Sequence, residues 1–207
     1  MRIAAAIALL CVFAGCRSKS PQPRVIAIQP IGFADAAQLR FIKGQLAAFF
    51  SCPVYVLRLA SMPPASLDQT KGERYSADSV LSWLSGRRDD SVSILVGLTR
   101  KDIFITKHDE QGRIREPAER YAVWGILGLG TCPGKVCVVS DARFFASAPE
   151  KYEHRLRTLL LHEIGHNLGL PHCSNPHCIM NDANEQIATV DSSGDDYCSG
   201  CRRRLGQ

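Results

Sequence analysis

Three histidines and one glutamate lie close together in the last quarter of the chain. His162 and His166 are four residues apart, Glu163 directly follows the first of them, and His172 comes six residues after the second. Four residues span about one helical turn, so on a helix His162 and His166 share a face and can bind one metal ion. Glu163 is offset around the helix, where its carboxylate can face the metal's water without occupying a coordination position. The spacing predicts a catalytic metal site with Glu163 as the general base.

A turn after this helix supplies the third ligand. Strong helix formers run from Tyr152 to Leu168, and Gly169 then permits the left-handed backbone that commonly ends a helix. Pro171 stiffens the turn that brings His172 back toward the metal. Three imidazoles with an open fourth position are typical of catalytic zinc. Such a zinc ion lowers the pKa of its water to about 7 and polarises a carbonyl.

The histidines continue into a regular series of cysteines and one methionine. The spacing HExxHxxGxxH matches the metzincin signature. The longer run, HExxHxxGxxHCx4CxMx17CxxC, resembles the archaemetzincin signature at every position from His162 to Cys201. Upstream, the strand-helix order and the run KVCVVSDARF are more loosely similar. From this run the chain is identified as similar to the archaemetzincins, a family of zinc metallopeptidases.

This resemblance implies a fold, an activity and a second metal. The fold is a compact three-layer α/β/α domain with a mixed, mainly parallel sheet and a C-terminal four-cysteine zinc site. The activity is hydrolysis of peptide bonds in a peptide or protein substrate, by Glu163-assisted attack of zinc-bound water. Met180 would be the Met-turn residue, an apolar floor beneath the histidines. The alternative is a zinc-binding scaffold lipoprotein without turnover, against which the intact Glu163 argues.

The second zinc ion would be held by four thiolates that tie the segment after the helix to the C-terminus. Closed four-ligand sites of this kind are structural, and the ligands would be Cys173, Cys178, Cys198 and Cys201. The resemblance therefore implies two zinc ions per chain. Because oxidising compartments favour disulfides, two disulfides among these cysteines remain the alternative. Cys132 and Cys137 flank a tight turn at Pro133-Gly134, where a further disulfide is feasible.

The elements that must position these residues alternate between strands and helices. An α/β arrangement with a mainly parallel sheet follows from that alternation. A nearly apolar run at 91–98 predicts a strand covered on both faces. The apolar, glycine-rich run 121–130 is expected to supply walls of the substrate pocket. The other predicted strands are 24–29, 54–59, 102–106 and 135–140, and the other helices are 34–50 and 76–84, with Ser76 as a cap.

The N-terminus predicts export. A positive Arg2 precedes an apolar run from Ile3 to Ala14 that is too short to span a bilayer comfortably. Small residues before Cys16 resemble the lipobox of a bacterial lipoprotein signal. We therefore expect a signal peptide over 1–16, lipidation of Cys16, a polar tether over 17–23 and a peptidase domain over 24–207. The predicted location is the bacterial cell envelope, with a lipid anchor in the membrane. A plain cleaved signal peptide and an uncleaved anchor are the alternatives.

Composition limits the remaining classes. A length of 207 residues, with 45% hydrophobic and 22% charged residues, is typical of one globular domain. The net charge of +5 lies partly in the C-terminal run 202–204. No nucleic-acid-reading module accompanies this run, so no nucleic-acid partner is expected.

Overall fold

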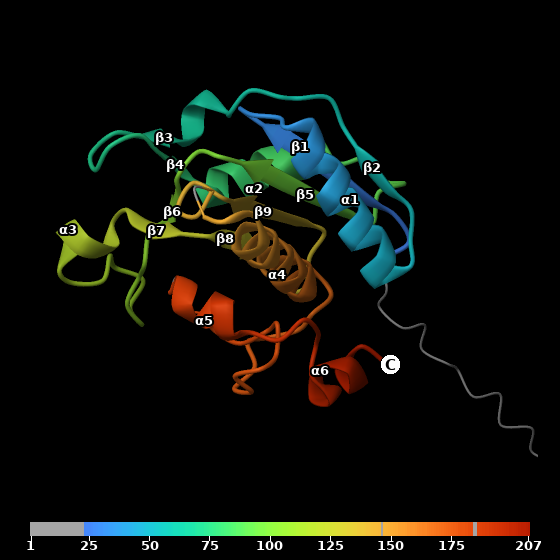
Figure 1. Ribbon diagram of the computed structural model, residues 1–207. Helices are drawn as coiled ribbons and strands as arrows, with labels where there is room; N and C mark the ends of the chain where they lie inside the picture. Colours follow the sequence, from blue (N-terminus) through green and yellow to red (C-terminus); the bar gives the residue numbers. More distant parts are fainter. Residues whose placement is uncertain (1–22, 146, 184–185) are drawn as a thin grey trace, which may run out of the picture.

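A five-stranded sheet forms the centre of the molecule (Figure 1). The computed structural model describes residues 23–145, 147–183 and 186–207. Four neighbouring strands of this sheet are parallel to one another, and the fifth, at one edge, is antiparallel to the strand beside it. The mainly parallel sheet predicted from the sequence is therefore confirmed. In sheet order the strands are β2 (Val54–Val56), β1 (Ile26–Ile31), β5 (Ile94–Thr99), β9 (Val136–Ser140) and β8 (Gly128–Gly130).

Helices cover both faces of this sheet. Helices α1 (Ala36–Phe50) and α4 (Pro149–Asn167) pack in one hydrophobic cluster with one face of the strands, and α2 (Ala77–Ser85) packs in a second cluster on the other face. Every residue of β1, β5 and β9 is consequently buried, which explains the nearly continuous apolar sequence of these strands. The three-layer arrangement follows, as expected.

Polar side chains start the first two helices. The Asp35 carboxylate accepts hydrogen bonds from the backbone amides of Ala37 and Gln38 at 2.8 and 2.9 Å. The Ser76 hydroxyl accepts one from the amide of Ser79 at 3.3 Å, as predicted for this cap. Such caps satisfy backbone donors that have no partner inside the helix.

A second, four-stranded sheet was not predicted. The expected strand at 102–106 lies in it, and the expected strand at 54–59 ends at Val56 in the central sheet. The run 121–130 divides between β7 (Trp124–Ile126) in this sheet and β8 in the central one, so it links the two sheets. The order is β3 (Leu67–Asp68), β4 (Arg74–Ser76), β6 (Ile103–Ile105) and β7 (Trp124–Ile126), and the short helices nearby are η1 (Pro64–Ser66) and α3 (Ala118–Tyr121).

The C-terminal segment lies on the side of α4 away from the central sheet (Figure 1) and contains α5 (Ile187–Ser192) and α6 (Ser199–Arg204). Arg155 of α4 donates two hydrogen bonds of 2.6 and 2.7 Å to the carboxylate of Asp191 in α5.

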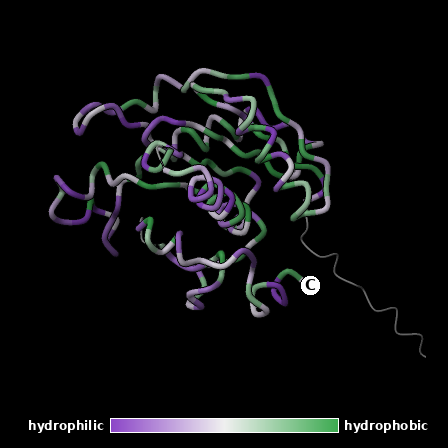
Figure 2. Tube along the Cα trace, viewed as in Figure 1, coloured by the Kyte–Doolittle hydropathy of each residue, from purple (hydrophilic) through white to green (hydrophobic). Residues whose placement is uncertain are grey.

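Figure 2 shows hydrophobic residues along the central strands and hydrophilic ones around α3. Over the described ranges, no helix has the length and apolar character required to cross a bilayer. The predicted signal peptide, Cys16 and nearly all of the tether lie outside the described residues.

Candidate active site and cysteine cluster

Helix α4 carries the first two predicted zinc ligands. Its residues Leu156, Leu160 and Ile164, at helical spacing, are buried against the sheet. The helix ends at Asn167 with Leu168 as its C-cap, and Gly169 then adopts a left-handed φ of 90°. The amide of Leu170 donates to the carbonyl of Gly165 at 2.9 Å, which closes the turn. The sequence-predicted reversal is therefore present.

The three histidines converge, with one ligand atom from each lying within 4.8 Å of the others. The Nε2 atoms of His162 and His166 are 3.1 Å apart. Their Nδ1 atoms lie 2.7 Å from the Ile179 carbonyl oxygen and 2.8 Å from the Leu170 carbonyl oxygen. These backbone partners leave both Nε2 atoms available to a metal.

The geometry and chemistry of this set fit zinc. Tetrahedral zinc with Zn–N distances of about 2.0 Å separates its nitrogen ligands by roughly 3.3 Å, close to the spacing of His162 and His166. Burial, with the charges of the neighbouring histidines, lowers the pKa of His162 to about 4, although the hydrogen bond to the Ile179 carbonyl acts in the opposite direction. Burial also lowers the pKa of His166. Both imidazoles are therefore neutral near neutral pH, which is the form that binds metal.

Glu163 lies against the edge strand β8 and is only 6% exposed. A Cβ atom at Gly128 would come within 2.6 Å of the Glu163 Oε1 atom, and one at Gly130 within 3.2 Å of Oε2. These glycines make the space that the carboxylate occupies. Burial raises the pKa of Glu163 to about 8, although a hydrogen bond from the Gly130 backbone lowers it in part. A raised pKa of this size suits a group that accepts and returns a proton near neutral pH.

Met180 packs directly on the helix that carries the histidines. Its side chain is 0% exposed, and a Cβ atom at Gly165 would come within 2.3 Å of its sulfur. Gly165 precedes His166, so the methionine fits into a gap in the helix surface next to the ligand pair. The role of Met180 as an apolar floor beneath the histidines stays a prediction.

A cleft of about 270 Å³ opens at the histidines and Glu163. Strands β7 and β8 form one side, α4 a second, and the segment after the third histidine a third. The run 121–130 thus contributes pocket walls, as expected. The apolar side chains that line the cleft include those of Ile105, Ile126, Leu159, Ile179 and Val190.

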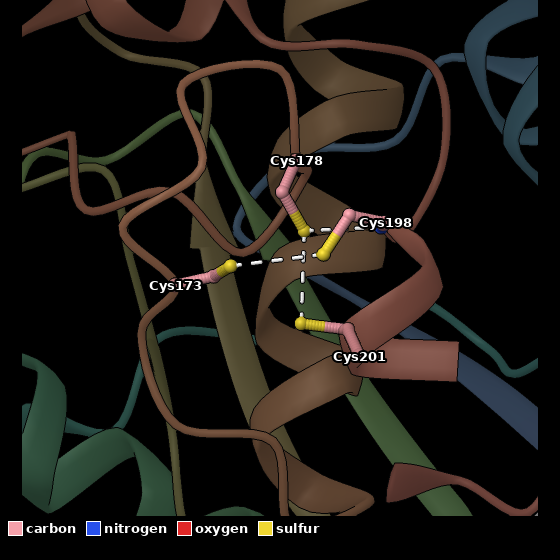
Figure 3. Close-up of side chains that lie close together, drawn as sticks. All are labelled: Cys173, Cys178, Cys198 and Cys201. Atoms are coloured by element: carbon pink, nitrogen blue, oxygen red, sulfur yellow. Dashed lines mark hydrogen bonds between the residues drawn. The ribbon is translucent and has the colours of Figure 1, made fainter. Parts of the chain in front are cut away.

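Four cysteines form a separate cluster, which Figure 3 shows with the sulfur atoms directed toward one another. Cys173 and Cys178 come from the loop after α4, and the other two from the start of α6. The Cys173–Cys198 sulfurs are 3.8 Å apart, and those of Cys178 and Cys201 are 3.7 Å apart. A zinc ion with Zn–S distances of about 2.3 Å places tetrahedral sulfurs roughly 3.8 Å apart. None of the four is disulfide-bonded, so the arrangement fits zinc.

The cluster also favours a thiolate. The backbone amide of Cys201 donates to the sulfur of Cys198, and together with the neighbouring thiols it lowers the pKa of Cys198 to about 6. The thiolate is the form of cysteine that binds metal. The amide of Cys173 donates to the carbonyl of Met180 at 2.7 Å, which ties the cluster to the floor of the histidine site.

Comparison with known proteins identifies the family. The model of peptidase family M54 matches residues 57–207. The chain belongs to peptidase family M54. It is 30% identical to the archaemetzincin of Methanopyrus kandleri over 146 residues, which cover 70% of this chain and 73% of that one. It is 27% identical to an archaemetzincin of Halobacterium salinarum over 189 residues, covering 87% and 98% of the two chains.

Solved archaemetzincin structures have the same fold as this M54 chain. The structure from Methanopyrus kandleri matches with a TM-score of 0.70 at 24% identity, over 88% of this chain and 93% of that one. The structure from Archaeoglobus fulgidus, complexed with malonate, matches with a TM-score of 0.70 at 24% identity, over 87% and 99% of the chains. The predicted family, the α/β fold and the zinc metallopeptidase class are thereby confirmed.

One disulfide considered from the sequence is absent from this M54 chain. Cys132 and Cys137 are both free thiols. Cys137 lies in β9 with its side chain in the core, whereas exposed Cys132 directs its sulfur to the Leu170 carbonyl oxygen at 3.5 Å. The two side chains therefore point to different surroundings. The short separation of the two cysteines could not reveal this, because the alternation of side chains along β9 decides which face Cys137 reaches.

Sequence reasoning missed three residues of the site. Gly128 and Gly130 are required by the approach of Glu163 to β8, and the alternating glycines of the run GLG at 128–130 are the sequence signal of such a close approach. Asp182 lies 3.4 Å from the Nδ1 atom of His172 and also lines the cleft. Nothing in its spacing from the histidine singles it out.

Proposed function

We propose that this M54 peptidase binds its catalytic zinc through His162, His166 and His172 and uses Glu163 as general base. The observation that carries the proposal is that the buried Glu163 lines the same cleft as three imidazoles whose ligand atoms lie within 4.8 Å of one another. The cleft gives a substrate access to the same atoms. A second zinc ion is proposed for the four-cysteine cluster.

Zinc, Glu163 and the backbone of β8 have separate roles in the proposed reaction. When bound, zinc supplies Lewis-acid polarisation of the scissile carbonyl and a water of lowered pKa. Glu163 accepts the proton of the attacking water at its carboxylate and delivers it to the leaving nitrogen. The β8 glycines and the Gly130 amide hold that carboxylate in position. Acid and base functions thus alternate on one buried group.

Strand β8 also offers a surface for the substrate backbone. It is the last strand of the central sheet, so in the described part of the chain only β9 pairs with it. An unpaired strand edge can bind an extended peptide through backbone hydrogen bonds. The apolar wall that includes Leu159 and Val190 then favours an apolar substrate side chain beside the scissile bond.

A peptide library with defined cleavage positions tests this proposal. We expect the full chain to cleave peptides after zinc loading, to lose activity on chelation, and to recover it when zinc is restored. Cleavage sites should be enriched in large apolar residues next to the scissile bond. A zinc-loaded protein that cleaves nothing in a broad library would instead support the scaffold alternative.

We propose, separately, that the chain is anchored to the membrane of the bacterial cell envelope through lipidated Cys16. Support comes from the positive start, the short apolar run and the small residues before this cysteine. Mass spectrometry of protein purified from its native membrane should find an N-terminal peptide that begins at Cys16 and carries acyl chains. A free cleaved N-terminus or a retained Met1 would contradict lipidation.

A further inference from the structure

The third histidine is held differently from the other two. His162 and His166 are fixed by α4 and by backbone carbonyls at their Nδ1 atoms. His172 lies after the helix on an irregular segment, and its side chain is 50% exposed. An exposed imidazole on a loop loses more rotational freedom on metal binding than one on a packed helix, unless a neighbour orients it.

That neighbour is Asp182. Its Oδ2 atom lies 3.4 Å from the Nδ1 atom of His172, and its side chain is 45% exposed. Asp182 follows Met180 by two residues, on a segment anchored by the hydrogen bond of 2.7 Å between the Cys173 amide and the Met180 carbonyl. The carboxylate therefore comes from a fixed stretch of backbone.

A carboxylate at Nδ1 has a defined effect on a metal-binding imidazole. It holds the proton on Nδ1, directs Nε2 to the metal and increases the basicity of the ring. With Asp182 counted, each of the three histidines has an oxygen acceptor near Nδ1.

We infer that Asp182 is a positioning residue of the catalytic metal site, which orients His172 and strengthens zinc binding. This inference rests on the proposed assignment of the three histidines as zinc ligands. As a surface ion pair alone, the contact would contribute little to stability because both side chains are about half exposed. We expect the contact to act on the metal site instead, because it orients the His172 ring for zinc binding.

Zinc affinity, measured without any peptide, tests the inference. The full chain, with its four-cysteine site loaded, is titrated with zinc against a competing chromogenic chelator. Asp182→Ala should weaken binding at the histidine site by about 10- to 100-fold, the range typical for partners of metal-ligating histidines. Asp182→Asn should lose less, since the amide oxygen can still accept from Nδ1. Asp90→Ala, which removes an exposed carboxylate from another ion pair, should change nothing.

A double substitution separates orientation from charge. In a His172→Ala background, Asp182→Ala should cause no further loss, because the ligand that it orients is gone. An equal loss from Asp182→Ala with and without His172, or unchanged zinc affinity in Asp182→Ala, would overturn the inference. Unfolding curves that match the wild type would show that the variants fold. Because no substrate is involved, a failure to cleave peptides would count against the proposed function and not against this inference.

Discussion

Glu163→Ala should lower kcat by at least about a hundredfold while the chain keeps its catalytic zinc. Glu163 lines the same cleft as the three imidazoles but is not one of the three proposed ligands, so the metal should remain. Strand β8, whose residues are Gly, Leu and Gly, has no side chain that could accept the proton of the water or return it to the leaving nitrogen in place of Glu163. General acid-base groups typically contribute about 10²- to 10⁴-fold. Steady-state cleavage of a library-derived peptide, with zinc content determined in parallel, measures both quantities.

Two further variants sharpen this test. Glu163→Gln keeps the volume of the side chain and an oxygen for the Gly130 amide, and should be as inactive as the alanine variant. His166→Ala should lose catalytic zinc and activity together, because it removes a ligand. Wild-type cleavage rates in Glu163→Ala would require the mechanism to be abandoned. Loss of zinc in that variant would show that Glu163 acts as a ligand.

Cys201→Ser should remove the zinc of the cysteine cluster and destabilise the fold. The Cys201 side chain is 3% exposed, and its sulfur lies 3.7 Å from the sulfur of Cys178. Its replacement therefore removes one of the four proposed zinc ligands. Structural zinc contributes about 10–16 kcal/mol in small zinc-binding peptides. In this larger domain we expect a loss of several kcal/mol, because the sheet and α4 still form a core. Elemental analysis should fall from two zinc ions per chain to one, and denaturant unfolding should shift to lower concentration.

Cys52→Ala is the matched control, because Cys52 is a free, half-buried thiol outside the cluster. It should retain both zinc ions. If the wild type instead contains one zinc ion and two disulfides, the zinc assignment of the cluster is wrong. The sulfur contacts of 3.8 and 3.7 Å then predict the pairs Cys173–Cys198 and Cys178–Cys201.

The sequence by itself determined the local parts of both sites. The spacing of His162 and His166 places two ligands on one helical face, and Gly169 permits the reversal toward His172. These relations span one or two turns of backbone, so they depend little on the rest of the chain. The apolar runs of the central strands likewise follow from burial on both faces, which is why the mainly parallel sheet was predictable.

Tertiary structure decided what surrounds these groups. The division of 121–130 into β7 and β8, the fit of Glu163 against Gly128 and the contact of Asp182 with His172 all join segments that are distant or irregularly spaced in sequence. The same holds for the free thiols of Cys132 and Cys137, which the short spacing suggested could pair. Periodicity reports which residues are buried along one element. It does not report which element packs on which, because that depends on the fit of side chains across the whole core.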